Sequence, residues 1–465
     1  MGGATAAANA GHLTGFGSKG YRSYVLLTLT LTYTLNFIDR ILISVVGRPI
    51  IDEFQLSNFQ FGILSGFGFA LFYTLLGIPI ASFSERANRV KIIGVCIILW
   101  SLATVLCGFT VGFMTLLLAR MAVGIGEAGC TPPANSLISD YYKPVSRPTA
   151  LGIYSMGVTA GGMLAQIFGG SLLKFVSWRE AFIFVGAPGI LIGLLVLFTV
   201  KEPPRGYSDP PGTKKQEKAG IGEALKEIAS KPTFWTMTAG ATIVAFAGYG
   251  MIGFQPLFIQ YAKGFSPGDT ALIFMSVFAL FGTIGTFLGG YLTEKGTKFS
   301  PTAACWVPGI GLLLAAPVQA YAYFTGNLTL MYVLMALGAI LQYFYLSAQY
   351  NIAQAVVSVR ARATSVAIML FIANIIGYGG GPAVLGILAD VFTAGYLDSS
   401  ELAGQLSASC SLADPEMSET FRSVCLEAKA HGVRLANASA TFLFAVGGIC
   451  YLLAGLTYRR DSEIK

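Results

Sequence analysis

Twelve long apolar stretches restrict what this chain can fold into. They lie at 23–47, 59–83, 91–111, 113–138, 148–173, 180–200, 233–260, 269–293, 301–323, 328–357, 363–390 and 436–458. A run of about 20 apolar residues is long enough to cross a bilayer as a helix. Only 11% of the residues are charged, against about 25% in soluble domains. The alternating pattern of a membrane β-barrel is absent. We therefore expect an all-α, polytopic membrane protein with twelve transmembrane helices.

The positive charges predict how the helices are oriented. If the N-terminus lies in the cytoplasm, 21 of the 30 Lys and Arg residues fall in cytoplasmic segments, 7 fall outside and 2 fall within the membrane. Such an excess sets the orientation of a membrane protein. We expect a multi-pass protein of the cell (inner) membrane with both termini in the cytoplasm. The net charge of +7 then reflects contact with anionic membrane lipids rather than binding of nucleic acid.

One long polar segment divides the chain into two sets of six helices. Residues 201–232 are rich in Pro, Gly and Lys and predict a cytoplasmic linker in which "IGEALKEIAS" forms a short helix. The segment 1–20 predicts a disordered cytoplasmic tail. The sequence thus predicts an N-terminal six-helix bundle at 21–200 and a C-terminal bundle at 233–465, with an external loop at 391–435.

The two halves repeat each other. "FALFYTLLGIPIASFSER" at 69–86 aligns with "FALFGTIGTFLGGYLTEK" at 278–295, and "RPTALGI" at 147–153 aligns with "RATSVAI" at 362–368. Internal repeats of this kind are typical of transporters, which bind substrate near the middle of the membrane between the repeats. We expect two pseudo-symmetric halves.

The loop after the second stretch resembles a motif of the major facilitator superfamily. That motif usually reads G-x-x-x-D-R-x-G-R, and here "ASFSERANR" at 81–89 keeps both arginines but replaces Asp with Glu and both glycines with Ala81 and Asn88. The resemblance implies a cytoplasmic gate motif. Its members, with the echo in the second half, are Glu85, Arg86, Arg89, Glu294 and Lys295.

Two further stretches are similar to the Spinster family within that superfamily. They are "NFIDRILISVVGRPI" at 36–50 and "RMAVGIGEAGCTPPANSLISDYY" at 120–142. The resemblance implies transport of sphingolipids or lysophospholipids. Related symporters of organic anions share both motifs.

A dinucleotide-binding spacing, G-x-G-x-x-G, also occurs at Gly124, Gly126 and Gly129. A phosphate-binding turn requires a strand before the glycines, whereas these glycines lie inside a predicted transmembrane helix, so we expect them to allow close helix packing. Motifs of ATP-driven pumps, metalloproteases and serine hydrolases are absent. We expect no enzyme activity and no cofactor, with a proton as the coupling ion.

Four charged residues fall well inside predicted helices, namely Asp39, Arg40, Arg120 and Glu127. Each costs about 2.5–3.5 kcal/mol to insert at mid-membrane, so they require compensation. Helical geometry gives Asp39 and Arg120 a similar depth and places Glu127 two turns from Arg120. We hypothesise that Asp39 pairs with Arg120 and that Glu127 faces Arg40.

Two interpretations of these charges remain open. They could be ion pairs that only hold two helices together, although such pairs stabilise proteins poorly because desolvation offsets their attraction. The alternative is functional: Asp39 or Glu127 exchanges the coupling proton, while Arg40 and Arg120 bind an anionic group.

Weakly polar and aromatic residues predict the remainder of a substrate cavity. The candidates are Asn36, Gln255, Tyr343, Gln349, Tyr350, Asn374 and Tyr378. A charged first half and an aromatic second half suit an amphipathic substrate. The alternative is that these side chains form interhelical hydrogen bonds, each contributing about 0.6 kcal/mol.

Glycine clusters "GYGMIG" at 248–253 and "GYGGGP" at 377–382 predict either hinges for alternating access or sites of close packing.

Of the seven cysteines, Cys410 and Cys425 lie in the predicted external loop, where a disulfide or two free thiols are equally expected. The two histidines, His12 and His431, are too isolated for a metal site, so we expect no bound metal.

The sequence thus favours a secondary-active, proton-coupled transporter of an amphipathic lipid, working as a monomer among membrane lipids. The alternatives are a proton-coupled symporter of small organic anions such as sugar acids, and a non-transporting membrane receptor on the same fold.

Overall fold

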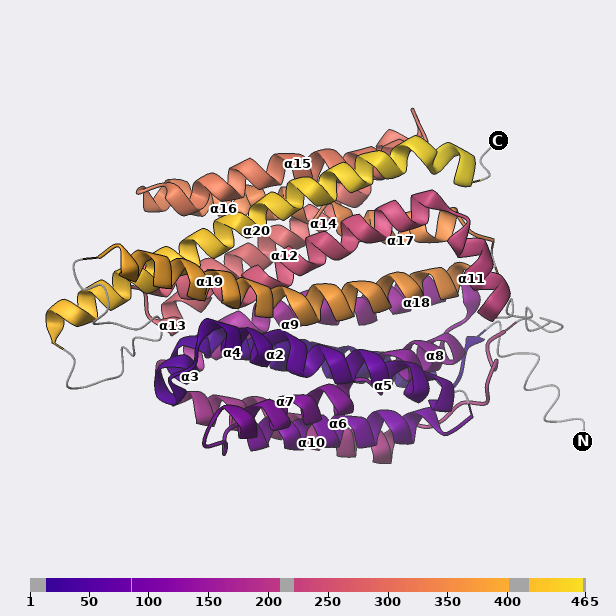
Figure 1. Cartoon of the computed structure of the whole chain (residues 1–465). Coiled ribbons are helices and arrows are strands. Elements are labelled where there is room, and N and C mark those ends of the chain that lie inside the picture. Colours follow the sequence, from indigo (N-terminus) through magenta and orange to yellow (C-terminus); the bar gives the residue numbers. More distant parts are fainter. Residues whose placement is uncertain (1–13, 85, 210–220, 359, 401–417, 463–465) are drawn as a thin grey trace, which may run out of the picture. The chain divides into compact units, whose positions relative to one another are not determined.

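The structure is a computed structural model that describes residues 14–84, 86–209, 221–358, 360–400 and 418–462. All regular secondary structure in these described residues is helical. They include twelve helical spans that are long and apolar enough to cross a membrane, which confirms the predicted fold class. Figure 1 shows these helices with their labels.

Several spans consist of more than one helix. The first six are built from α2 (Lys19–Val45), α4 (Asn58–Gly62) with η1 (Ile63–Phe67) and α5 (Gly68–Ser84), α6 (Arg89–Cys107), α7 (Phe113–Glu127) with α8 (Thr131–Tyr141), η2 (Pro144–Ser146) with α9 (Arg147–Leu172), and α10 (Trp178–Thr199). The last six are built from α12 (Pro232–Lys263), α13 (Pro267–Asp269) with η3 (Thr270–Met275) and α14 (Ser276–Thr297), α15 (Ala303–Phe324), α16 (Leu328–Gln342) with α17 (Tyr345–Ala355), α18 (Arg362–Ile372) with η4 (Ala373–Gly380) and α19 (Gly381–Asp398), and α20 (Glu419–Asp461). Two short helices, α3 (Gly47–Phe54) and α11 (Ile221–Ala229), lie between spans.

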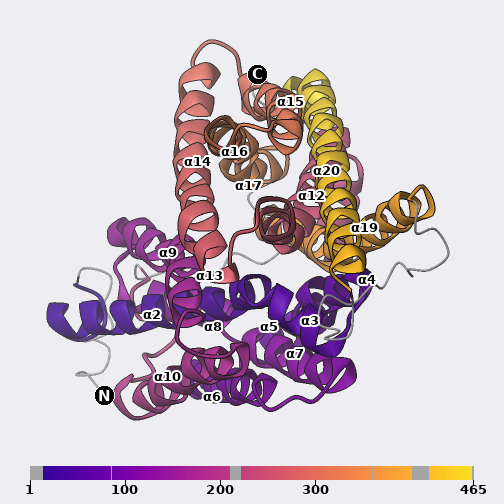
Figure 2. The same cartoon turned by 90° about the vertical axis from the view of Figure 1, so that its left-hand side faces the viewer.

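The chain divides into two compact units. Unit 1 comprises Met1–Ile43 and Gly68–Gln216, and unit 2 comprises Ser44–Phe67 and Glu217–Lys465. Within unit 1, α6 contacts both α7 and α10 (Figure 2). Within unit 2, α20 packs along α12, α15 and α19.

The glycines of the G-x-G-x-x-G stretch are packing residues. A Cβ atom on Gly124 would lie 2.6 Å from the backbone oxygen of Phe69 on α5, and one on Gly126 would lie 2.6 Å from the backbone nitrogen of Trp100 on α6. Real Cβ atoms do not approach other atoms this closely. These glycines therefore let α7 press against both neighbours, as the sequence predicts.

The segment 44–67 belongs to unit 2, although its position in the sequence assigns it to the N-terminal bundle. The reason is close packing of α4 on α19. A Cβ atom on Gly62 would lie 2.2 Å from the backbone oxygen of Pro382, and one on Gly386 would lie 2.3 Å from that of Asn58. Side chains at these two glycines would force the helices apart.

The two glycine clusters that predict hinges or packing sites lie against each other. A Cβ atom on Gly381 would lie 2.1 Å from the backbone oxygen of Phe246, and one on Gly250 would lie 2.9 Å from Leu385. "GYGMIG" lies inside the unbroken α12, whereas "GYGGGP" spans the end of the π-helix η4. Close packing accounts for both clusters, and hinge motion remains a prediction.

Segments outside the predicted spans are more ordered than the sequence indicates. The predicted surface helix is present as α11. The predicted external loop is shorter, because α19 continues to Asp398 and α20 already begins at Glu419. Of the predicted tail, residues 1–13 lie outside the described residues, whereas Phe16 packs edge-on against Tyr141 at a ring distance of 5.4 Å.

Candidate functional site

Two ion pairs join α2 to α7 inside unit 1. Arg40 Nε lies 2.6 Å from Glu127 Oε2, and Arg120 Nη1 lies 3.3 Å from Asp39 Oδ1. These are the two pairs that the sequence predicts, so the pairing is confirmed, while the roles of the residues remain predictions. We call these four residues the four-charge cluster.

The local sequence places these side chains. Asp39 and Arg40 are neighbours on α2 and therefore project in different directions. Arg120 and Glu127 are seven residues apart on α7, which places them on one face about two turns apart. Each residue on α2 can thus reach a different partner on the same face of α7. The helix ends immediately after Glu127, since Pro132 and Pro133 have no backbone N–H to continue it.

The two pairs differ in exposure. The side chains of Asp39 and Arg120 are 2% and 0% exposed, whereas the Arg40 side chain is 11% exposed beside a fully buried Glu127. Arg40 is therefore the member of the cluster with most access to other molecules in this conformation.

Aromatic rings surround Arg40. Its guanidinium carbon lies 4.9 Å from the Phe37 ring centre, 4.9 Å from that of Phe69 and 4.3 Å from that of Tyr73. The Phe69 ring also lies 5.5 Å from the Arg120 guanidinium. Cation–π attraction of this kind stabilises a guanidinium group that is removed from water. These rings are not among the residues predicted from the sequence, although Phe37 lies three residues before Arg40 and thus on the same helix face.

A third helix completes the contacts of Asp39. Thr104 on α6 donates a hydrogen bond to Asp39 Oδ2, and its hydroxyl also lies 3.0 Å from the backbone oxygen of Trp100. Thr104 has no distinctive signal in the sequence, because a lone threonine in a transmembrane helix commonly bonds its own backbone.

Several polar atoms of the site have no hydrogen-bond partner among the described residues. They are Nε and Nη2 of Arg120, Oε1 of Glu127 and Oδ1 of Asn36. Buried polar atoms in native proteins are nearly always satisfied by protein, water or a bound molecule. The site therefore retains donors and acceptors that a proton, water or a polar substrate group can use.

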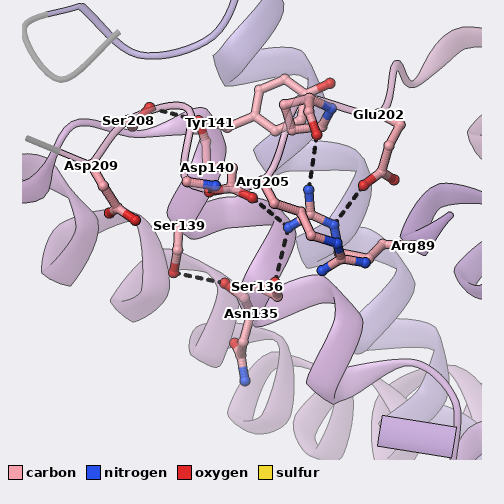
Figure 3. A network of polar contacts seen from close by, with 12 residues as sticks. Arg89, Asn135, Ser136, Ser139, Asp140, Tyr141, Glu202, Arg205, Ser208 and Asp209 are labelled. Atoms are coloured by element: carbon pink, nitrogen blue, oxygen red, sulfur yellow. Dashed lines mark hydrogen bonds and ion pairs between the residues drawn. The ribbon is translucent and has the colours of Figure 1, made fainter. Parts of the chain in front are cut away.

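A second polar cluster lies where α5 is followed by α6 (Figure 3). Arg89 is buried there and its guanidinium donates to Asp140 Oδ2 at 2.5 Å, to Glu202 Oε1 at 2.6 Å and to Ser136 Oγ at 2.9 Å. Glu202 Oε2 also accepts from the backbone nitrogen of Val90 in the first turn of α6. We call Arg89, Ser136, Asp140 and Glu202 the Arg89 cluster.

The start of the predicted linker is part of this arrangement. Arg205 Nη2 donates to the backbone oxygens of Ser84 and Ala87 at 2.6 and 2.8 Å, and Asp140 Oδ1 accepts from the backbone nitrogen of Gly206. The segment after α10 is therefore fixed against the α5–α6 loop. The sequence predicts Arg89 but not its acidic partners, which lie in "SDYY" and "KEPPR" after the fourth and sixth spans.

The other predicted gate residues differ from Arg89 in their surroundings where the structure describes them. Arg86 is exposed, and Glu85 lies outside the described residues. In the second half, Lys295 is exposed and Glu294 lies 3.8 Å from Lys298 on the surface. Exposed pairs of this type contribute little, so the echo of the motif forms no comparable buried cluster.

The cavity candidates of unit 2 come from α12, from the span of α16 and α17, and from η4. Tyr378 lies 4.4 Å from the Tyr249 ring, and Tyr343 and Tyr350 belong to the same tyrosine-rich region. Gln255 instead lines a small, mostly apolar cavity with Phe274 and Met335. Gln349 is buried on α17 and Asn374 is half-buried in η4.

The short helix α3 in unit 2 also carries charged residues. Arg48 lies 3.6 Å from Asp52 and 5.1 Å from the Tyr261 ring centre. Burial raises the pKa of Asp52 above its ordinary value, although Lys429 and Arg48 act in the opposite direction. These residues are not among those predicted from the sequence.

The described cysteines fall into two classes. Cys96, Cys107, Cys130, Cys305 and Cys450 are free, and Cys425 is disulfide-bonded. Its predicted partner, Cys410, lies outside the described residues. Within the described part of the chain, no group of three His, Cys, Asp or Glu residues could hold a metal ion.

Comparisons with known proteins identify the family of this chain. Residues 29–382 match the family model of the Major Facilitator Superfamily. Two crystal structures of a bacterial homolog to the human lysosomal transporter Spinster, both inward-facing, one unoccupied and one occupied, superimpose with TM-scores of 0.88 and 0.85. They share 45% and 43% sequence identity and cover 96% of this chain and 99% of theirs.

Curated relatives agree with this assignment. An MFS-type efflux pump of Mycolicibacterium smegmatis is 29% identical over 93% of this chain and 92% of its own length. Protein spinster homolog 1 of Mus musculus is 28% identical over 80% of this chain and 74% of its own length. These relatives are transporters and not enzymes. The chain belongs to the major facilitator superfamily and is a membrane transporter of the Spinster type.

Proposed function

We propose that this transporter couples proton movement to the translocation of an amphipathic lipid, such as a lysophospholipid or sphingolipid, by alternating access. The observation that carries the proposal is the double ion pair of the four-charge cluster. Each carboxylate lies against one guanidinium in a buried site, where burial and the positive charge act in opposite directions on proton affinity. Such a carboxyl group can gain and lose a proton during the cycle.

Arg40 is the member best suited to hold an anionic headgroup. Its guanidinium is partly exposed and can bind phosphate or carboxylate in a bidentate manner. The rings of Phe37, Phe69 and Tyr73 around it provide apolar surface for the adjoining part of a lipid. The resemblance to Spinster proteins supports a lipid as the substrate.

A small organic anion is the second candidate substrate, because Arg40 and Arg120 could in principle clamp it together. The geometry favours the lipid over this clamp. Arg120 is fully buried and bonded to Asp39, so only Arg40 is exposed enough to meet a substrate in this conformation.

We infer that the protein lies in the inner membrane with both termini in the cytoplasm and acts as a monomer without a cofactor. The distribution of Lys and Arg supports this orientation. The disulfide-bonded Cys425 supports it as well, since disulfides persist in oxidising compartments. The Arg89 cluster then lies at the cytoplasmic end of unit 1.

The substrate is tested with purified protein in liposomes under an imposed pH gradient. Lysophospholipids and sphingoid phosphates are compared with sugar acids, and headgroup charge is varied at constant chain length. We expect saturable lipid transport that depends on the gradient and falls at least tenfold in Arg40→Gln. Uptake of sugar acids with no transport of lipids would contradict the proposal.

A matched control variant distinguishes a specific loss of lipid transport from a general loss of transport activity. Glu223 is an exposed acid on α11, and Glu223→Gln should transport lipid like the wild type. If Glu223→Gln and Arg40→Gln lose equal activity, the assignment of Arg40 is wrong.

A further inference from the structure

Asp39 is enclosed by groups from three helices. On α7, Arg120 donates to Oδ1, and Glu127 interacts with Asp39 electrostatically. On α2 itself, Arg40 is the nearest charge in sequence and acts on Asp39 as well. On α6, Cys107 and Thr104 face the carboxylate, and only Thr104 hydrogen-bonds to it.

The Thr104 hydroxyl has two acceptors but one proton. It can donate to Asp39 Oδ2 or to the backbone oxygen of Trp100, 3.0 Å away and one turn earlier on α6. A hydroxyl carries one donor and two acceptor lone pairs. Thr104 is fully buried, so its hydroxyl is not in contact with bulk solvent in this conformation.

In each protonation state of Asp39, the hydroxyl hydrogens of this group can therefore all be donated to an acceptor. When the carboxylate is ionised, Thr104 donates to Oδ2. When a proton arrives on Oδ2, the new O–H bond donates to the Thr104 oxygen, and the Thr104 hydroxyl turns to donate to the Trp100 oxygen. Arg120 stays charged in both states, because a guanidinium does not lose its proton in proteins.

We propose that Thr104 is a positioning residue for proton exchange, whose hydroxyl rotates between Asp39 and the Trp100 carbonyl as Asp39 loses or gains its proton. The proposal rests on the proposed proton coupling. It assigns to α6 a direct part in the proton chemistry of the α2–α7 pair.

Comparison with another buried threonine, Thr32, shows how the hydrogen bonding of Thr104 differs. Thr32 on α2 is 4% exposed, and its hydroxyl donates to the backbone oxygen of Thr28 at 2.9 Å. It has the ordinary backbone bond of a helical threonine, with no carboxylate as a second acceptor. Thr32→Val therefore makes the same chemical change at a matched depth of burial.

The test measures the pH of half-maximal lipid transport in liposomes for Thr104→Val, Thr104→Ser and Thr32→Val. Loss of a donor to the ionised carboxylate favours the protonated form, so Thr104→Val should move this pH upward by about one unit. Thr104→Ser retains the hydroxyl and should stay near the wild-type value, as should Thr32→Val. Thr104→Ala replaces Thr104→Val if the latter is not recovered folded from membranes.

A second readout does not depend on transport. In the purified protein, the infrared band of the protonated carboxyl that disappears in Asp39→Asn should titrate at higher pH in Thr104→Val. Coincident titrations of wild type and Thr104→Val, or an equal shift in Thr32→Val, would overturn the proposal. Absence of any pH dependence of wild-type transport would instead contradict the proton coupling, while the infrared titration still decides the role of Thr104.

Discussion

At the scale of single residues, the four-charge cluster concentrates charge where a membrane protein can least easily solvate it. Asp39, Arg120 and Glu127 are at most 2% exposed. Sequence alone predicts these residues and their pairing, because charged side chains inside apolar helices have an unfavourable free energy of insertion and require partners. Sequence does not predict Thr104 or the rings around Arg40, because threonines and aromatic residues are common in membrane helices for other reasons.

Removal of one member of a buried ion pair should lower the free energy of unfolding by more than removal of both members. Arg120→Met leaves the Asp39 carboxylate without its guanidinium, and the expected loss is about 3–5 kcal/mol in the free energy of unfolding. The double variant Asp39→Asn with Arg120→Met should recover a substantial part of this loss. Thermal unfolding in detergent checks the prediction, and a double variant as unstable as the sum of the single variants would contradict it.

At the scale of helices, hydropathy predicts the spans but not their interior breaks. All twelve spans are present. The break between α7 and α8 follows from Pro132 and Pro133, a signal that was available in the sequence. The π-helices η1, η3 and η4 have no comparable signal in the sequence.

One contact between helices gives an element-scale prediction. Asp390 on α19 accepts hydrogen bonds from the backbone nitrogens of Asn58 and Phe59 in the first turn of α4, both at 3.0 Å. A carboxylate is favoured at a helix N-terminus by both charge and hydrogen bonding. Asp390→Ala should speed hydrogen–deuterium exchange of these two amides by about tenfold.

An exposed acid on the same helix provides the control. Asp398→Ala should leave the exchange of Asn58 and Phe59 unchanged, because Asp398 is exposed at the end of α19. Unchanged exchange in Asp390→Ala would show that α4 is held by glycine packing rather than by this carboxylate.

At the scale of the whole molecule, the internal repeat predicts two halves, but the compact units do not follow the repeat. The segment 44–67 lies in unit 2, because Gly62 and Gly386 let α4 approach α19. Such packing depends on residues more than 300 positions apart in the sequence, so no local pattern indicates it. The acidic partners of Arg89 lie 51 and 113 positions away, so no local pattern indicates them either.

Proton movement is coupled to substrate translocation through the four-charge cluster in the proposed mechanism. The most direct measurement records the internal pH of liposomes when lysophospholipid or sphingoid phosphate is added without an imposed gradient. We expect substrate-driven proton movement by the wild type and by Glu223→Gln, and its loss in the double variant Asp39→Asn with Glu127→Gln. Undiminished proton movement in that double variant would show that coupling does not depend on these two carboxyl groups.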